Sequence, residues 1–158
     1  MIYTDMTRKA IRLIFEKHAG QLDKSGLPYV THPLHVAESM TDEDSTCAAL
    51  LHDIVEDTGM TFEELRSMGF SERVVNALRY LTHEDGVDYY DYVRHIAENP
   101  LALQVKLADL RHNADLTRLI KVTDKDLQRV EKYRKCIAYL EDVRDGRDRA
   151  SHRGRFLV

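Results

Sequence analysis

The chain has 158 residues, of which 43 % are hydrophobic and 32 % are charged, with only 7 glycines and 3 prolines. This composition predicts a single soluble, helix-rich domain, 1–158, that is large enough for a hydrophobic core. The net charge of −4 argues against nucleic-acid binding driven by phosphate contacts, and no apolar stretch approaches the roughly 18 residues of a membrane-spanning helix.

The compartment follows from the first residues and from the cysteines. The start of the chain carries an acid and no small-residue cleavage site, so it does not resemble a signal peptide. Cys47 and Cys136 form no Cys-x-x-Cys pair and lie in apolar helical stretches, so we expect reduced structural thiols and a cytoplasmic protein. The Arg-rich residues 144–158 are interpreted as a helix end and a mobile tail, with an anion-binding tail as the alternative.

Apolar residues recur with the 3.6-residue period of a helix and predict an all-α bundle of about seven or eight helices. The core is expected over about 8–140, and a turn-rich segment, 20–30, separates the first two helices. In chain order, the helices are expected over 6–19, 31–40, 44 or 45 to 57–59, 61–69, 71–81, 88–98, 101–116 and 124–143.

Polar residues that precede the apolar patterns predict where several helices begin. Thr31 is the expected N-cap of the second helix, and Asp44 or Ser45 that of the third. Residues 61–64 have the pattern of a capping box. The third helix is expected to continue unbroken to 57–59.

Four side chains suit a divalent metal ion. His32 lies at a helix start, His52 and Asp53 follow an apolar run, and Asp109 interrupts an apolar helical face. A buried imidazole beside a carboxylate is costly without a partner, and a metal ion is a partner that suits both groups. Two nitrogen and two carboxylate donors fit Mn²⁺, Fe²⁺, Co²⁺ or Zn²⁺ and leave positions open for water and substrate.

Polar neighbours of these candidates suggest further roles. Glu56 and Asp57 lie one helical turn beyond the His-Asp pair, where carboxylates can orient a water molecule and accept its proton. Asn113 is four residues after Asp109, so its amide lies beside the same point and can bind a substrate oxygen.

Each residue also has an ordinary interpretation on its own. A His-Asp pair can be a local hydrogen bond, Glu56-Asp57 can close a helix, Asp109 can pair with Lys106 or Arg111 on the surface, and Asn113 can cap a helix. One shared site explains all of them more economically. The other histidines lack such acidic neighbours and are expected to serve in packing, on the surface or around the site: His18, His35, His83, His95, His112 and His152.

The order of these residues resembles the HD-domain metal-dependent phosphohydrolases, and in particular the hydrolase domain of the RelA/SpoT alarmone enzymes and their small stand-alone relatives. The resemblance covers roughly residues 8–140. The motifs that carry it are Gly-Leu-Pro-Tyr-Val-Thr-His-Pro at 26–33, Leu-Leu-His-Asp-Ile-Val-Glu-Asp-Thr at 50–58, Val-Lys-Leu-Ala-Asp at 105–109 and His-Asn at 112–113.

The resemblance implies removal of the 3′-pyrophosphate from (p)ppGpp, with Mn²⁺ as the usual metal. It implies that Glu56 and Asp57 manage the attacking water and that the metal ligands are His32, His52, Asp53 and Asp109. Positions that match nucleotide or phosphate contacts are Lys24, Asn113, Arg129 and Tyr133. For Arg129 and Tyr133, a solvated Arg and a half-buried Tyr are an equally good interpretation. The partner is a small nucleotide, without nucleic acid or membrane, and a homo-oligomer is compatible with the sequence.

Two positions depart from the family pattern on the side that recognises the base. Asp23 stands where the family has an Arg that contacts guanine, and Asp115 lies where a basic residue is common. These departures leave other substrates open, namely a nucleoside monophosphate, a dNTP or NADPH. Two further alternatives remain. One is a metal-containing module that binds a nucleotide without cleaving it, and the other is a purely structural helical scaffold. No synthetase domain is seen, so we expect no alarmone synthesis.

Overall fold

Helix α3 (Glu43–Leu51) lies at the centre of the fold, and α1, α2, α6 and α8 pack around it. Residues 45–51 are all buried. A helix that is covered on all sides needs no polar face, which explains why 47–51 is a continuous apolar run. The computed structural model describes residues 1–147.

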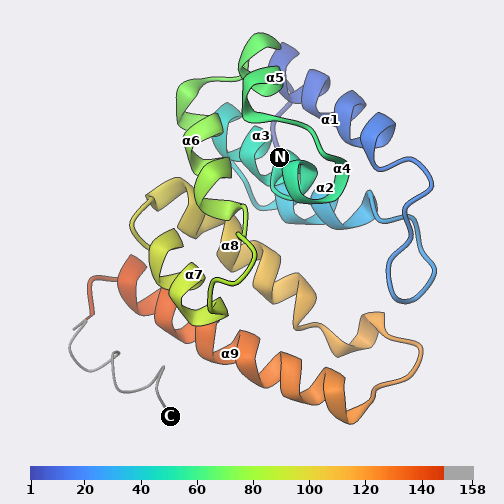
Figure 1. Ribbon diagram of the computed structural model, residues 1–158, viewed down its shortest axis with the longest axis vertical. Helices are drawn as coiled ribbons and strands as arrows, with labels where there is room; N and C mark the ends of the chain where they lie inside the picture. Colours follow the sequence, from blue (N-terminus) through green and yellow to red (C-terminus); the bar gives the residue numbers. More distant parts are fainter. Residues whose placement is uncertain (148–158) are drawn as a thin grey trace.

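Within residues 1–147 the chain forms nine α-helices, one short 3-10 helix (η1) and no strand, so the all-α prediction is confirmed (Figure 1). The only strand-like pairing in this range is an isolated bridge between Leu22 and Pro28. Apart from α3, the helices are α1 (Asp5–Lys17), α2 (Thr31–Glu38), α4 (Ile54–Thr58), α5 (Phe62–Ser67), α6 (Glu72–Leu81), α7 (Tyr89–Ile96), α8 (Pro100–Asn113), η1 (Leu116–Arg118) and α9 (Asp124–Arg144).

The helix expected to run unbroken through the His-Asp pair is in fact two helices, so that prediction was wrong. Helix α3 ends at Leu51, His52 is its C-cap, and Asp53 is the N-cap of α4. Successive side chains of an α-helix point about 100° apart. At the turn between the two helices, the side chains of His52 and Asp53 nevertheless meet, with His52 Nε2 3.0 Å from Asp53 Oδ2. Helix α4 then ends at Gly59, whose φ of 72° lies in the left-handed region.

Two predicted N-caps also differ from the structure. Asp42, not Asp44 or Ser45, caps α3, and it forms a capping box with Ser45. Thr31 is the first residue of α2, and its hydroxyl donates to Pro28 O at 2.9 Å in the preceding turn instead of capping the helix. The capping box that starts α5 at Thr61 is confirmed.

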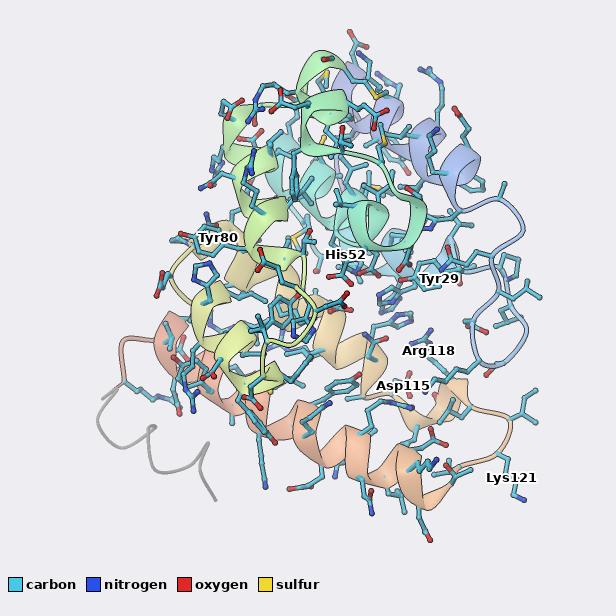
Figure 2. The ribbon with its side chains drawn as sticks, in the orientation of Figure 1. Tyr29, His52, Tyr80, Asp115, Arg118 and Lys121 are labelled. Atoms are coloured by element: carbon cyan, nitrogen blue, oxygen red, sulfur yellow. The ribbon has the colours of Figure 1, made fainter. Side chains whose placement is uncertain are left out.

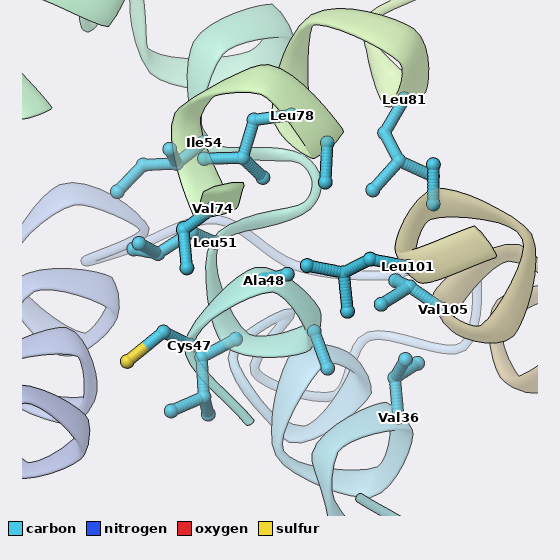
Figure 3. Close-up of a cluster of buried hydrophobic side chains, with 14 of the residues drawn as sticks. Val36, Cys47, Ala48, Leu51, Ile54, Val74, Leu78, Leu81, Leu101 and Val105 are labelled. Atoms are coloured by element: carbon cyan, nitrogen blue, oxygen red, sulfur yellow. The ribbon is translucent and has the colours of Figure 1, made fainter. Parts of the chain in front are cut away.

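The hydrophobic core joins α3 to the helices around it (Figure 3). Leu51, Val74, Leu78 and Val105 are all at most 1 % exposed and come from three different helices. Helix α8 connects this core to the second half of the fold, because it packs on α2, α3 and α6 and also lies beside α9 (Figure 1). Helices α3 and α8 are therefore held firmly in the core.

Two regions outside the core bear on the predictions. Helix α9 ends at Arg144, and residues 148–158 of the proposed tail, which include His152, lie outside the described residues. Among residues 1–147, no helix combines the length and the apolarity needed to span a membrane. Cys47 and Cys136 are both free and buried, as expected.

Candidate active site

The four predicted metal ligands meet at one point between α2, α8 and the α3–α4 turn. His32 Nε2 lies 3.0 Å from Asp109 Oδ1 and 3.2 Å from His52 Nε2. His52 Nε2 lies 3.0 Å from Asp53 Oδ2 and 3.6 Å from Asp109 Oδ1. The distance from His32 Nε2 to Asp53 Oδ2 is 3.8 Å. His32, His52 and Asp109 form a tight buried group, whereas the Asp53 side chain remains 24 % exposed.

The hydrogen bonds of the imidazoles leave both Nε2 atoms able to offer an electron pair. His52 Nδ1 donates to Ala49 O at 2.7 Å. His32 Nδ1 lies 2.7 Å from His112 Nδ1. Burial, and then the charge of Arg118, lower the pKa of His112 to about 3, so His112 is neutral. In the tautomer whose Nδ1 accepts, His32 donates through its own Nδ1 and keeps Nε2 for another partner. Two imidazole nitrogens and two carboxylates therefore face one point, and once the Nε2 atoms are free of protons this set fits a divalent cation.

The electrostatics of this point favour a positive charge. Burial alone would lower the pKa of His52, but the carboxylates of Asp53 and Asp109 raise it well above the ordinary value. Burial would raise the pKa of Asp53, yet His52 lowers it to about 2. The pKa of Asp109 is held well below its usual range, against burial, chiefly by Lys106. Both acids are thus ionised, and a cation between them is stabilised.

Asp109 is oriented by two neighbours on its own helix. Lys106 Nζ donates to Asp109 Oδ2 at 2.7 Å in the protein interior, and Asn113 Nδ2 donates to Asp109 Oδ1 at 2.7 Å. The pairing with Lys106 that was considered for the surface therefore exists, but it is buried. The expected approach of Asn113 to Asp109 is also found. Hydrogen bonds to a ligating carboxylate fix its direction and hence the position of the metal.

Asp53 is held by a tyrosine from the segment before α2. The hydroxyl of Tyr29 donates to Asp53 Oδ2, the oxygen that also faces His52. Burial and the negative charge of Asp53 raise the pKa of Tyr29, so the phenol keeps its proton and remains a donor. The Tyr29 ring lies 5.7 Å from the His32 ring and 5.1 Å from the His18 ring.

The two acids predicted to manage water have different surroundings. Asp57 lines the cavity beside the metal ligands and accepts a hydrogen bond from Gln21 Nε2 at 3.1 Å. Glu56 accepts the backbone N–H of His83 and is not part of the cavity wall. Partial burial raises the pKa of Glu56; the hydrogen bond from His83 opposes this rise, and the nearby Asp53 carboxylate adds to it.

A cavity of about 430 Å³ opens beside this centre, and its wall includes His32, Asp53 and Asp57. All the residues predicted to contact substrate also line it: Lys24, Asn113, Arg129 and Tyr133. Within the described residues, a larger hollow of about 860 Å³ beside α8 and the end of α9 contains none of the predicted site residues. The candidate ligands and the candidate substrate contacts thus share one cavity.

The two acids that depart from the family pattern are both engaged in local structure. Asp23 Oδ1 accepts hydrogen bonds from the backbone N–H groups of Ser25, at 2.8 Å, and of Leu27, at 3.0 Å. Asp115 caps η1 and accepts from Thr117 N at 3.0 Å. Both carboxylates therefore accept hydrogen bonds from the protein itself.

Several residues of the site were not singled out from the sequence. Arg118 lies on the cavity wall, near Asp115 (Figure 2). His112 bonds His32, Tyr29 bonds Asp53, and Lys106 bonds Asp109. Tyr29 and Lys106 lie inside the motifs quoted above. Each is three residues before a candidate metal ligand in the sequence, and this short separation could have indicated that they belong to the site. His112 also lies in a quoted motif, but its contact with His32 could not be foreseen, and Arg118 offered no signal, because these contacts join segments far apart in the chain.

Comparisons with known proteins identify the family and the fold. Residues 10–145 match the family model of the HD domain. A solved structure described as "A metazoan ortholog of SpoT hydrolyzes ppGpp and plays a role in starvation responses" superposes with a TM-score of 0.72 and 25 % identity, and the match covers 99 % of this chain and 94 % of that one.

Curated relatives are similar over most of this chain. Guanosine-3′,5′-bis(diphosphate) 3′-pyrophosphohydrolase MESH1 from Danio rerio is 36 % identical over 129 residues, which are 73 % of this chain and 71 % of the relative. The guanosine-3′,5′-bis(diphosphate) 3′-pyrophosphohydrolase of Aquifex aeolicus is 33 % identical over 70 % of this chain but only 18 % of its own length, and the probable GTP pyrophosphokinase of Mycobacterium leprae is 35 % identical over 73 % and 16 %. This chain thus spans a small part of the longer relatives. The chain belongs to the HD domain family.

Proposed function

We propose that the protein is a metal-dependent phosphohydrolase that cleaves guanosine 3′,5′-bis(diphosphate), ppGpp, into GDP and pyrophosphate. The observation that carries this proposal is the convergence of His32, His52, Asp53 and Asp109 beside a cavity that also contains the cationic side chain of Lys24. The substrate is supported by relatives that carry the name of this activity, one of which matches over 71 % of its length.

The proposed cofactor is one divalent ion, and we favour Mn²⁺. Two imidazole nitrogens and two carboxylate oxygens are a mixed donor set that suits Mn²⁺ and also accommodates Fe²⁺, Co²⁺ or Zn²⁺. When bound, such an ion polarises a phosphoryl oxygen and lowers the pKa of water from about 15.7 toward 7. The proposed ligands need no large movement to reach a common ion, because their donor atoms already lie 3.0–3.8 Å apart.

The proposed reaction is a direct attack by water on the phosphorus next to the ribose 3′ oxygen. The new bond joins the water oxygen to phosphorus, and the bond from phosphorus to the 3′ oxygen breaks. Asp57 orients the water from the cavity wall, and the carboxylate of Asp57 or Glu56 accepts a water proton and later releases it to solvent, while the departing 3′ oxygen takes one proton from solvent and leaves as a hydroxyl group. Gln21 holds Asp57 in place. No serine or cysteine nucleophile takes part, so no covalent intermediate forms.

The proposed substrate contacts surround the cavity. Lys24 offsets phosphate charge, and the Asn113 amide offers a hydrogen bond beside Asp109. Arg129 and Tyr133 lie one turn apart on α9 and present a guanidinium and a hydroxyl together. The ion pair of Arg129 with Asp126, at 2.8 Å, orients the guanidinium group.

We also propose a reducing, cytoplasmic location. Cys47 and Cys136 are both free and buried. Burial raises the pKa of Cys47 to about 12 and of Cys136 to about 11, so neither thiol ionises near neutral pH. Thiols of this kind serve packing and are compatible with a compartment in which disulfides do not persist.

A second candidate is an HD-type hydrolase of another nucleotide, such as a nucleoside monophosphate, a dNTP or NADPH. The observation in its favour is Asp23, a carboxylate on the cavity wall where the family has a guanine-contacting Arg. A module that binds a nucleotide without cleaving it is less well supported, because Asp57 lies in the cavity with its carboxylate directed by Gln21. Activity against a nucleotide panel separates these candidates.

The test is incubation of the purified protein with ppGpp and Mn²⁺, followed by anion-exchange separation of GDP and pyrophosphate. We expect turnover that depends on added metal and falls at least about 100-fold in Asp53→Ala and Asp57→Asn. Glu56→Gln is expected to reduce kcat with little change in bound manganese.

The matched control is Asp91→Asn, an exposed acid on α7 that ion-pairs with Arg94 and does not line the cavity. This variant is expected to retain wild-type turnover. Production of GDP by Asp53→Ala at the wild-type rate would refute the assigned roles. Turnover of a different nucleotide in preference to ppGpp would replace the substrate while keeping the reaction class.

A further inference from the structure

Arg118 is a cation on the cavity wall to which the reaction scheme assigns no role. We propose that Arg118 binds an oxygen acceptor of the nucleotide at a point remote from the bond that is cleaved, and that Asp23 positions its guanidinium group. The acceptor is either an oxygen of the 5′-diphosphate or the carbonyl edge of the base. The inference rests on the proposed function, since it names a further contact of the same substrate.

The Arg118 guanidinium is held on one side and open on another. Its Nη1 donates to the backbone oxygen of His112 at 3.0 Å, and its Nη2 lies 3.7 Å from Asp23 Oδ2. The side chain is 25 % exposed, and it borders the cavity. A guanidinium group has five N–H donors in a rigid plane, so these two contacts leave donors for a ligand.

Asp23 serves Arg118 without presenting a free charge to the ligand. Its Oδ1 already accepts from the N–H groups of Ser25 and Leu27, and its side chain is only 15 % exposed. Oδ2 is the oxygen that faces Arg118. The negative charge of Asp23 is therefore shared between a turn and a guanidinium group, and it orients the arginine toward the cavity.

The backbone that carries Arg118 is tied to the 23–25 segment, which also lines the cavity. Ser25 Oγ donates to Arg118 O at 2.7 Å, across a separation of 93 residues in the chain. Asp115 caps the three-residue η1 and so defines the turn that ends in Arg118. Figure 2 shows Arg118 between the segment after α1 and η1, on the same side of the fold as Tyr29. The contacts on both sides pre-organise the side chain, which lowers the entropic cost of binding.

The charges of the cavity wall explain why a further cation is useful. Four acids line the cavity, against three cations: Asp23, Asp53, Asp57, Asp115, Lys24, Arg118 and Arg129. A nucleotide with two diphosphate groups carries a large negative charge. One metal ion and one lysine cannot neutralise all of it. Arg129 is engaged by Asp126 at 2.8 Å, whereas Arg118 has only a longer ion pair. Arg118 is thus the more available of the two guanidinium groups.

The experiment measures binding of GDP to the purified full chain by isothermal titration calorimetry, because GDP carries the 5′-diphosphate and the base but no bond to be cleaved. We expect Arg118→Ala to weaken GDP binding about 10- to 100-fold, as for loss of a charge-assisted hydrogen bond, and Arg118→Lys to weaken it less. The control is Arg111→Ala, an exposed arginine on α8 that pairs with Glu141 and lies outside the cavity. Its GDP affinity is expected to equal that of the wild type.

ADP and guanosine identify the acceptor. If Arg118→Ala weakens ADP and GDP equally, the contact is to the diphosphate; if it weakens GDP and guanosine equally and leaves ADP unchanged, the contact is to the base carbonyl. Asp23→Asn keeps an oxygen for Ser25 and Leu27 but loses the ion pair, and we expect about a threefold to tenfold loss of GDP affinity. Circular dichroism and thermal melting establish that each variant is folded.

Two results would overturn the inference: unchanged GDP affinity in a folded Arg118→Ala, or no GDP binding to the wild type at millimolar concentration. The GDP measurement stands apart from catalysis. A wild type that binds GDP through Arg118 but does not cleave ppGpp contradicts the proposed function and not the role of Arg118. With ppGpp as substrate, Arg118→Ala is expected to raise KM at least about 10-fold and to leave kcat within about twofold.

Discussion

Lys106 Nζ lies 2.7 Å from Asp109 Oδ2 inside the protein, and it leaves Asp109 Oδ1 to face the two histidines. The ammonium group also lies over the ring of Tyr92, 5.3 Å from its centroid. A lysine that is only 9 % exposed is stable as a cation because the adjacent carboxylate and the aromatic face compensate for lost hydration.

Replacement of this lysine is predicted to weaken both the fold and the metal centre. Lys106→Met removes one partner of a buried ion pair, which costs about 3–5 kcal/mol of unfolding free energy. Because Asp109 loses the donor that fixes its direction, Mn²⁺ affinity is expected to fall about 10- to 100-fold. Chemical denaturation and Mn²⁺ titration measure the two effects. Lys135→Met, at an exposed position of α9, is the matched control, and equal effects in both variants would contradict the prediction.

Metal removal is predicted to abolish turnover and to lower thermal stability. Ligands that bind only the folded state add about 2.7 kcal/mol at 100 times their Kd, so Mn²⁺ is expected to raise the melting temperature of chelator-treated protein. His32→Ala is expected to lose this rise, since its Nε2 faces both His52 and Asp109. The control is His95→Ala, at a histidine on α7 that stacks on Tyr80. Full turnover in metal-free protein would rule out the proposed chemistry.

The orientation of Asp57 is predicted to depend on a hydrogen-bonded chain from α1. His18 Nδ1 donates to Gln21 Oε1 at 2.8 Å, and the amide nitrogen of Gln21 donates to Asp57 Oδ2. Gln21→Leu removes this support, and we expect kcat to fall about tenfold, equal to about 1.4 kcal/mol, with bound manganese unchanged. Gln104→Leu, at an exposed position of α8, is expected to have no effect. A drop in metal content instead of kcat would assign Gln21 to the metal centre.

The pH profile is predicted to lose activity on the acid side through Glu56. Partial burial raises the pKa of this carboxyl above its ordinary value of 4.5. Only the ionised form accepts a proton, so turnover is present above the raised pKa and falls as the pH drops through it. Rates measured at saturating Mn²⁺ separate this effect from metal loss. Glu56→Gln is expected to abolish the acid limb, and a limb that persists unchanged in this variant would assign it to another group.

The helices could be predicted well because their signals are local. The capping box at Thr61 and the helix expected over 71–81 both appear at the expected places. The break in the third helix was missed, because the residues around His52 and Asp53 contain no glycine or proline that would mark it. The break accompanies a change in packing, since α1, α2, α6 and α8 surround α3, whereas α4 packs chiefly on α1.

The candidate ligands could be named from the sequence because they interrupt apolar segments where a polar group needs a partner. Their roles and those of Glu56 and Asp57 remain predictions until the variants are measured. The contacts that surround these ligands could not be predicted from the sequence. His112 and Arg118 act through His32, Asp23 and Ser25, at separations of 80 residues or more, and no local pattern reports such pairs.

By itself the sequence determined an all-α protein with a candidate metal site, because helical periodicity and costly buried polar groups are properties of short segments. Only the tertiary structure decided that donor atoms from α2, α8 and the turn between α3 and α4 lie within 3.0–3.8 Å of one another. It also decided that Asp23 faces Arg118. Distances between residues far apart in the chain arise from the packing of whole helices, which no short segment specifies.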